Sequence, residues 1–179
     1  MTPTKKQPLF IISGASGVGK STLCEVLFRQ ETDYIVLESD ILWHEVYNTP
    51  EDDYRVYRQM CLSLCANVAQ IGKPVVLCGC ATPKQFEALP ERTLFTGNHH
   101  LAIVSENESL EDKTRNGREI SDEKWIASSI HFNDWLKTNG EASGMTLLDN
   151  SSLTPQEGAE IVDGWIKEKS GISGMLNKT

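Results

Sequence analysis

The chain has 179 residues, with 17 basic and 25 acidic side chains and a formal net charge of -8. This length suits one domain with its own core, so we expect a single domain over 1–179 with flexible ends at 1–8 and 171–179. The acidic balance argues against bulk nucleic-acid binding, because a phosphate backbone attracts basic surfaces. No apolar run approaches the roughly 20 residues that cross a bilayer, and the first residues lack the apolar core of a secretory signal, which predicts a cytoplasmic chain with no membrane contact.

Short apolar segments alternate with amphipathic ones along the chain. The apolar segments, which have the length and composition of buried parallel strands, are 9–13, 34–39, 74–79, 100–104 and 145–148. Helices are predicted from about residue 20, over 49–70, from about 121 and over 154–169. This order predicts a three-layer α/β/α fold with a five-stranded, mostly parallel sheet.

A glycine-rich segment, Gly-Ala-Ser-Gly-Val-Gly-Lys-Ser-Thr, follows the first predicted strand directly. Its spacing, G-x-x-x-x-G-K-[ST], is that of a phosphate-binding P-loop. The glycines let backbone N–H groups approach phosphate oxygens, Lys20 places an ammonium near the β- and γ-phosphates, and Ser21 offers a hydroxyl to Mg²⁺. We therefore predict nucleotide contacts from Gly14, Ala15, Ser16, Gly17, Val18, Gly19, Lys20, Ser21 and Thr22.

Acidic residues follow the second predicted strand, where open α/β sheets bind ligands. Asp40 is the candidate catalytic residue, because a carboxylate there can accept a proton from an attacking hydroxyl or hold Mg²⁺ through water. Glu38 is the alternative, and a plain helix N-cap is the alternative role for Asp40. The third strand ends in Cys78-Gly79-Cys80, without the carboxylate that orders Mg²⁺ in many ATP-hydrolysing P-loop proteins.

A short basic stretch, 112–118, follows the fourth predicted strand. We predict a lid at about 110–121 in which Arg115 and Arg118 fold over the nucleotide and neutralise charge on the transferring phosphoryl group. The alternative is a solvated loop whose charges offset the neighbouring acids.

The five cysteines are an odd number, and four of them lie in apolar stretches. This usage predicts reduced thiols that serve as small core residues, and their spacing disfavours a structural zinc site.

Together the P-loop, Asp40, the basic stretch and the segment 147–152 resemble the small P-loop kinases of the nucleoside- and nucleotide-kinase type. Gluconate and shikimate kinases and antibiotic phosphotransferases are also similar. The resemblance implies ATP and Mg²⁺ as cofactors, an acid that activates the acceptor hydroxyl, and lid arginines that clamp phosphates. It also implies that the loop after the last strand lies against the adenine, through Asp149 and Ser151.

The expected activity is transfer of the γ-phosphoryl group of ATP to a hydroxyl or phosphate of a small metabolite, preferably a nucleoside or nucleotide. A kinase for a sugar acid or an antibiotic is one alternative, and an ATP-binding regulatory switch with little phosphotransfer is another. The predicted acceptor wall comprises Trp43, His44, Tyr54 and Arg58. We expect a monomer or homodimer.

Overall fold

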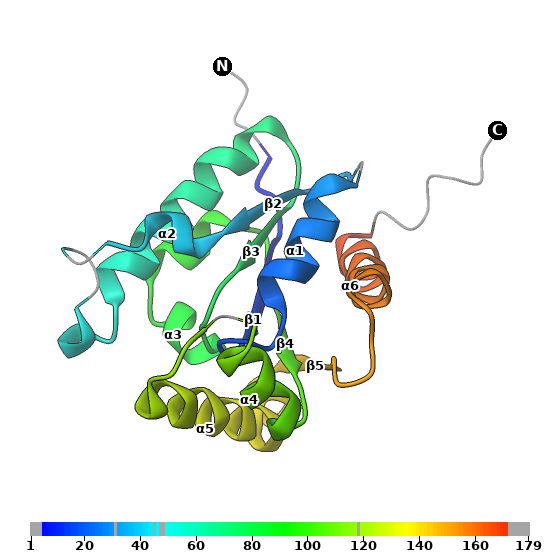
Figure 1. Ribbon diagram of the computed structural model, residues 1–179. Helices are drawn as coiled ribbons and strands as arrows, with labels where there is room; N and C mark the ends of the chain where they lie inside the picture. Colours follow the sequence, from blue (N-terminus) through cyan, green and yellow to red (C-terminus); the bar gives the residue numbers. More distant parts are fainter. Residues whose placement is uncertain (1–4, 31, 45, 47–48, 118, 172–179) are drawn as a thin grey trace.

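The computed structural model of the chain describes residues 5–30, 32–44, 46, 49–117 and 119–171 (Figure 1). The strands are β1 (Leu9–Gly14), β2 (Ile35–Glu38), β3 (Val75–Cys78), β4 (Asn98–Val104) and β5 (Met145–Asp149). The α-helices are α1 (Lys20–Arg29), α2 (Arg55–Val68), α3 (Pro83–Glu87), α4 (Asn107–Arg115), α5 (Glu123–Asn139) and α6 (Pro155–Ser170). Short 3-10 turns include η1 (Ser39–Leu42) and η2 (Pro50–Asp52).

The five strands form one sheet in the order β2-β3-β1-β4-β5, and every pairing in it is parallel. β1 lies in the centre and is buried along its whole length. A strand that is covered on both faces reads as a continuous apolar run, which is why its position could be predicted from the sequence. The predicted α/β fold with five strands is confirmed.

Helices cover both faces of the sheet, so the fold has three layers (Figure 1). Phe10 and Ile12 of β1 pack in one core with side chains of α1 and α6. Leu9 and Ile11 point the other way, into a second core that includes α2 and α3. Farther along that second face, α5 packs on β4 through a smaller cluster that includes Leu136.

The predicted helix over 49–70 is wrong at its start. Thr49 begins only the turn η2, and α2 starts at Arg55. Asp53 and Tyr54, between the two, both have left-handed backbone angles, with φ of 54° and 57°. The Asp52 carboxylate accepts hydrogen bonds from the Thr49 hydroxyl and from the Arg55 amide, and such local capping competes with a continuous helix.

Two other helices were missed. α3 begins at a reciprocal capping box between Thr82 and Gln85, a signal that the sequence contains in Thr-Pro-Lys-Gln. α4 occupies much of the predicted lid, and it buries only Leu110 and Thr114, so it has too narrow an apolar stripe to be recognised. Within the described residues, no helix is long and apolar enough to span a membrane.

Candidate active site

The P-loop connects the central strand β1 to α1 at the carboxyl edge of the sheet. Gly17 and Gly19 have φ values of 84° and 103°, which side chains larger than glycine rarely adopt. α1 begins at Lys20, directly after the second of them. Backbone N–H groups at the start of a helix and around a left-handed turn point outward together, and this arrangement favours an anion.

Lys20 lies over the loop. Its ammonium donates to the carbonyl oxygens of Gly14 at 2.8 Å and Ala15 at 2.7 Å. Ser21 and Thr22, in the first turn of α1, are exposed and available to a ligand.

A cavity of about 490 Å³ opens beside this loop. Its lining comprises Gly17, Gly19, Lys20, Ser21, Thr22, Leu23, Lys113, Gly117, Asn150, Leu153 and Pro155. The lining thus joins the P-loop to the end of α4 and to the loop between β5 and α6. Five of the nine predicted P-loop contacts lie in it, whereas Gly14, Ala15, Ser16 and Val18 do not.

The loop after β5 reaches the cavity through Asn150, which sequence reasoning missed. The Asn150 side chain is buried, and its amide donates to the Val18 carbonyl at 3.0 Å. Leu153 and Pro155 extend the same wall with apolar surface, which suits a planar base.

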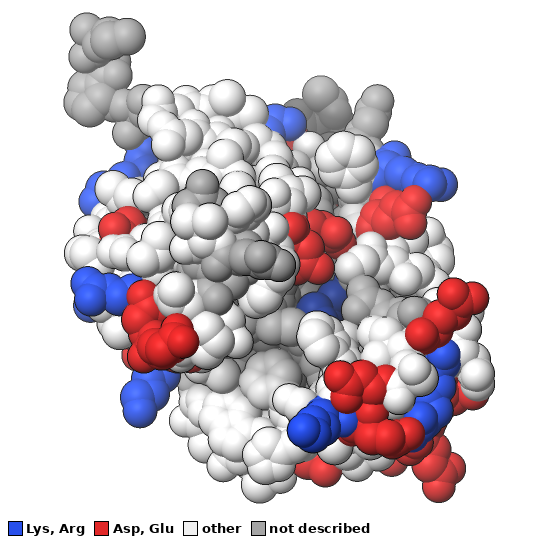
Figure 2. All heavy atoms as spheres, turned by 60° about the vertical axis from the view of Figure 1, so that its left-hand side comes forward, with Lys and Arg blue, Asp and Glu red and all other residues white. Residues whose placement is uncertain are grey.

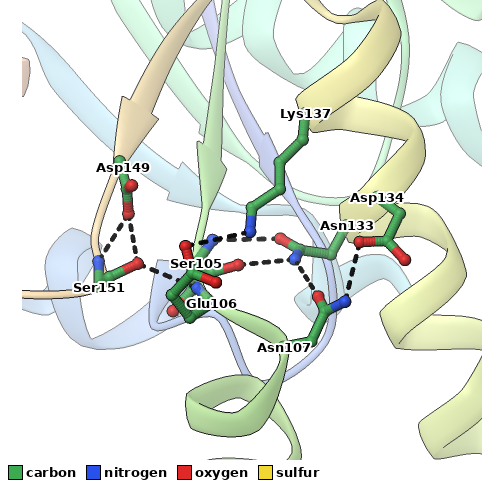
Figure 3. Close-up of polar contacts among 8 residues, drawn as sticks. All are labelled: Ser105, Glu106, Asn107, Asn133, Asp134, Lys137, Asp149 and Ser151. Carbon is green, nitrogen blue, oxygen red and sulfur yellow. Dashed lines mark hydrogen bonds and ion pairs between the residues drawn. The ribbon is translucent and has the colours of Figure 1, made fainter.

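Asp149 and Ser151, the two predicted adenine contacts, are not in the cavity lining. The Asp149 carboxylate accepts hydrogen bonds from the backbone amide and hydroxyl of Ser151, and these bonds hold the pKa of Asp149 below its ordinary value (Figure 3). The Ser151 hydroxyl in turn accepts from the Glu106 amide at 2.9 Å. Both side chains therefore shape the loop, and the residue between them faces the nucleotide side.

Buried polar contacts join α5 to the segment between β4 and α4 (Figure 3). The fully buried Asn133 accepts from the Ser105 amide at 3.2 Å and donates to the Ser105 carbonyl at 2.7 Å. It also donates to Asn107, which itself donates to Asp134 at 2.9 Å. These bonds fix the start of α4, the helix whose other end lies at the cavity.

Arg115 ends α4 and is held by two carboxylates. Its guanidinium pairs with Glu111 at 2.8 Å and with Glu123 at 2.7 Å, and both partners raise the pKa of Arg115. Arg118 lies outside the described residues. The basic side chain of α4 that the structure does place at the cavity is Lys113, two residues before the end of the helix.

Asp40 lies in η1, just beyond β2, and is exposed, whereas Glu38 at the strand end is half-buried. Neither belongs to an ion pair within the described ranges. The intervening Ser39 is buried, and a Cβ on Gly79 would lie 2.5 Å from its hydroxyl, so β2 and β3 approach closely here. Burial raises the pKa of Tyr57, whose hydroxyl interacts with Ser39.

The end of β3 contacts the P-loop without offering a carboxylate. The Ala81 amide donates to the Ser13 hydroxyl at 3.0 Å, and the Cys80 thiol lies 3.1 Å from the Gly14 carbonyl. Because these contacts fix the β3 end beside the P-loop, the residues around Asp40 lie along the same edge of the sheet as the nucleotide cavity.

The cysteine prediction is wrong for one pair, because Cys24 of α1 and Cys78 of β3 form a disulfide. Cys61, Cys65 and Cys80 are free thiols, the first two of them buried. Burial raises the pKa of Cys61 to about 11 and that of Cys65 to about 12, so both are inert at neutral pH. Packing of α1 on one face of the sheet brings Cys24 and Cys78 together, which a sequence separation of 54 does not reveal.

Aromatic rings gather next to Asp40. Trp43 packs against Tyr54 and Tyr57, with ring centroids 5.7 and 5.3 Å apart. The Arg58 guanidinium lies 5.7 Å from the centre of the Tyr54 ring, and it is buried. Of the predicted acceptor wall, Trp43, Tyr54 and Arg58 are thus brought together, while His44 is exposed and accepts a hydrogen bond from the Val46 amide.

The residues present fit ATP with Mg²⁺. The left-handed glycines, Lys20 and the cavity suit the phosphates, and the Ser21 hydroxyl is an oxygen ligand of the kind that Mg²⁺ prefers. Among the described residues there is no cluster of three or more His, Cys, Asp or Glu side chains that could cage a metal ion. Mg²⁺ in phosphoryl-transfer sites needs none, because phosphates and waters supply most of its ligands.

Fold and loop together define a P-loop nucleotide-binding domain of the α/β/α type. A family model described as an AAA domain matches residues 9–86, which is less than half of the chain. A search of curated proteins finds no match.

Several solved structures share the fold over almost the whole chain. A gluconokinase from Sinorhizobium meliloti is similar with a TM-score of 0.70 and 14% identity, covering 97% of this chain and 99% of that one. The tunicamycin resistance protein of Deinococcus radiodurans is similar with a TM-score of 0.69 and 14% identity, covering 90% of this chain and 96% of that one. A sugar kinase from a Janibacter species is similar with a TM-score of 0.68 and 15% identity, covering 94% of this chain and 98% of that one. The predicted resemblance to small P-loop kinases is confirmed at the level of the fold.

Proposed function

We propose that this chain is an ATP-dependent kinase that transfers the γ-phosphoryl group to a small metabolite. The observation that carries the proposal is the position of Asp40 and its neighbouring aromatic rings on the same edge of the sheet as the P-loop cavity. Such an edge can bring an acceptor hydroxyl and the nucleotide's γ-phosphate together. The names of the gluconokinase and the sugar kinase with this fold support the same reaction class.

In the proposed reaction, the acceptor oxygen attacks the γ-phosphorus and forms the new P–O bond. The bond from that phosphorus to the β–γ bridging oxygen breaks, and ADP leaves. Asp40 accepts the proton of the acceptor hydroxyl, and Lys20 with the P-loop amides stabilises charge on the phosphates. Ser21, and Asp40 through water, would hold Mg²⁺, and the bound ion would add further charge neutralisation.

Arg115 and Arg118 are proposed to neutralise the transferring group from a lid at about 110–121. For Arg115 this role requires that its guanidinium leave Glu111 and Glu123, since both now hold it. Lys113 is the other candidate, because it already lines the cavity.

Residues 1–179 are proposed to act as one domain, as a monomer or homodimer. A nucleoside or nucleotide is the proposed acceptor class, and a sugar acid or an antibiotic is the alternative. A second candidate function is an ATP-binding switch with little phosphotransfer. The absence of a carboxylate after β3, where Cys78-Gly79-Cys80 stands, favours it.

The test is ADP release from Mg-ATP with pools of nucleosides, nucleoside monophosphates, sugar acids and aminoglycosides, each compared with an acceptor-free control. A kinase predicts that one pool raises turnover at least about tenfold, which corresponds to about 1.4 kcal/mol of barrier. ATP binding with no stimulation by any pool would refute the kinase and support the switch.

The Asp40→Asn variant tests whether Asp40 acts as the catalytic base or only as a helix N-cap. We expect ATP affinity to be kept and transfer to fall by about 10²- to 10⁴-fold. Asp33→Asn is the matched control, because Asp33 is an exposed acid at the opposite end of β2. Unchanged transfer in Asp40→Asn would rule out the base role.

A further inference from the structure

The buried cation on the acceptor side is neutralised by the chain itself. Arg58 is 7% exposed, and its two terminal nitrogens lie 3.3 and 3.5 Å from the two carboxylate oxygens of Asp53. No other carboxylate pairs with Arg58 in the part of the chain that the structure describes. Arg58 is the buried arginine among the described residues, and its guanidinium is therefore already engaged by a carboxylate of the same chain.

The backbone conformation before α2 positions Asp53 for its ion pair with Arg58. Asp53 and Tyr54 are two consecutive left-handed residues, an unusual conformation for side chains other than glycine. Because the chain turns here, the Asp53 carboxylate reaches Arg58, and it also accepts from the Gln85 side chain of α3 at 3.1 Å. Donors from two helices thus hold one carboxylate, that of Asp53, with two thirds of its side chain exposed.

Two acids on this side lie outside every ion pair of the described residues. With Arg58 and Asp53 paired, Glu38 and Asp40 remain as acids that belong to no ion pair among the described residues. The face shown in Figure 2 is hollowed near its middle, and acidic and basic atoms meet there. Beside these acids lie the rings of Trp43 and Tyr54, which can stack on a planar or cationic group.

We infer that the acceptor is a hydroxyl compound without negative charge, such as a nucleoside or an amino-sugar, and that Asp53 determines this specificity. The inference rests on the proposed kinase function. A carboxylate or phosphate on the acceptor would have to displace Asp53 from Arg58, or else lie beside the negative charges of Asp53, Asp40 and the γ-phosphate. Like charges brought together in a partly desolvated site oppose binding.

The test uses pairs of acceptors that differ in charge: a nucleoside against its 5′-monophosphate, and D-glucitol against D-gluconate. ADP release at constant ionic strength gives kcat/KM for each. We expect the neutral member of the active pair to exceed the anionic one at least about tenfold.

Asp53→Asn then tests the specificity role. Asparagine tolerates the left-handed backbone as aspartate does, so the turn is kept while the charge is removed and Arg58 becomes available to an anion. We expect the neutral-to-anion ratio to fall at least about tenfold, and the thermal midpoint to confirm folding. Glu87→Gln, at an exposed acid of the same helix as Gln85, is the control and should leave the ratio unchanged.

A wild-type preference for the anionic member would overturn the inference while leaving the kinase intact, and that result does not depend on any variant folding. An unchanged ratio in Asp53→Asn would overturn the role of Asp53. Failure of every acceptor, neutral or anionic, would refute the proposed function, and the inference would fall with it.

Discussion

Replacing Gly17 by alanine tests how closely α4 packs on the P-loop. A Cβ at this position would lie 2.3 Å from the hydroxyl oxygen of Thr114, and the residue's φ of +84° is strained for any side chain. Thr114 is fully buried and its hydroxyl donates to the Leu110 carbonyl, so it cannot simply turn away. We therefore expect two separable losses in the free energy of unfolding, one from the strained backbone angle and one from the steric overlap with Thr114.

The backbone cost is about 1–2 kcal/mol, and overpacking adds about 1–3 kcal/mol. Gly17→Ala should thus lower the free energy of unfolding by about 2–5 kcal/mol, measured by urea denaturation. Gly144→Ala isolates the first cost, because its φ is +86° and nothing lies within 4 Å of the added Cβ. It should lose only about 1–2 kcal/mol.

A double-mutant cycle with Thr114→Ala isolates the second cost. Removing the hydroxyl makes room for the new methyl group, so the two substitutions should couple by about 1–3 kcal/mol. ATP affinity should fall in Gly17→Ala, because the loop must shift to relieve the clash. Coupling below about 0.5 kcal/mol, or equal losses in Gly17→Ala and Gly144→Ala, would refute the close packing of α4 on the loop.

Three further predictions follow from buried groups. Reducing the Cys24–Cys78 disulfide should lower the free energy of unfolding by about 4 kcal/mol in the chain-entropy model, given the 54-residue separation, as measured by denaturation with and without dithiothreitol. Burial lowers the pKa of His100 from 6.5 to about 4, so its contribution to stability is present above pH 6.5 and is lost as the pH falls toward 4. His100→Gln should remove about 3 kcal/mol of that loss from the stability–pH curve. Asn150→Ala should cost about 1–3 kcal/mol and weaken ATP binding, because the Val18 carbonyl loses its donor.

Each has a control. Cys61→Ser leaves the disulfide in place, so the effect of the reductant should persist in it, and a count of five reactive thiols in the unreduced, unfolded protein would contradict the disulfide. His131→Gln, at an exposed histidine of α5, should keep the wild-type pH curve. Asn139→Ala removes an amide-to-carbonyl bond within α5 and should leave ATP affinity unchanged. A pH curve of His100→Gln that matches the wild type, or unchanged ATP affinity in Asn150→Ala, would contradict the burial arguments.

The core of the fold could be predicted because its signals are local. A strand buried on both faces is a short apolar run, and the P-loop lies between one such run and a helix. α4 escaped prediction because it buries little, and the break before α2 escaped because it depends on the Asp52 carboxylate capping Arg55.

The residues of the candidate site likewise divide into those that a local motif predicts and those that depend on the folded structure. Lys20 and Ser21 could be predicted as site residues because the motif fixes their positions, and the structure places both in the cavity lining. After β5 the motif gives no guidance, and the side chain that faces the cavity is Asn150, one position away from each predicted contact. The structure brings Arg58 and Tyr54 of the predicted acceptor wall into contact, but the pairing of Arg58 with Asp53 depends on a turn that no local pattern signals.

The Cys24–Cys78 link bears on how this protein can move. It ties α1, which carries Lys20, to β3, whose end contacts the P-loop, so these two elements form one mechanical unit. Any closure around ATP and an acceptor then has to come from segments outside that unit. Segments outside that unit that line the cavity include the end of α4, with Lys113, and the loop between β5 and α6, with Leu153. The disulfide therefore leaves closure to elements that it does not cross-link.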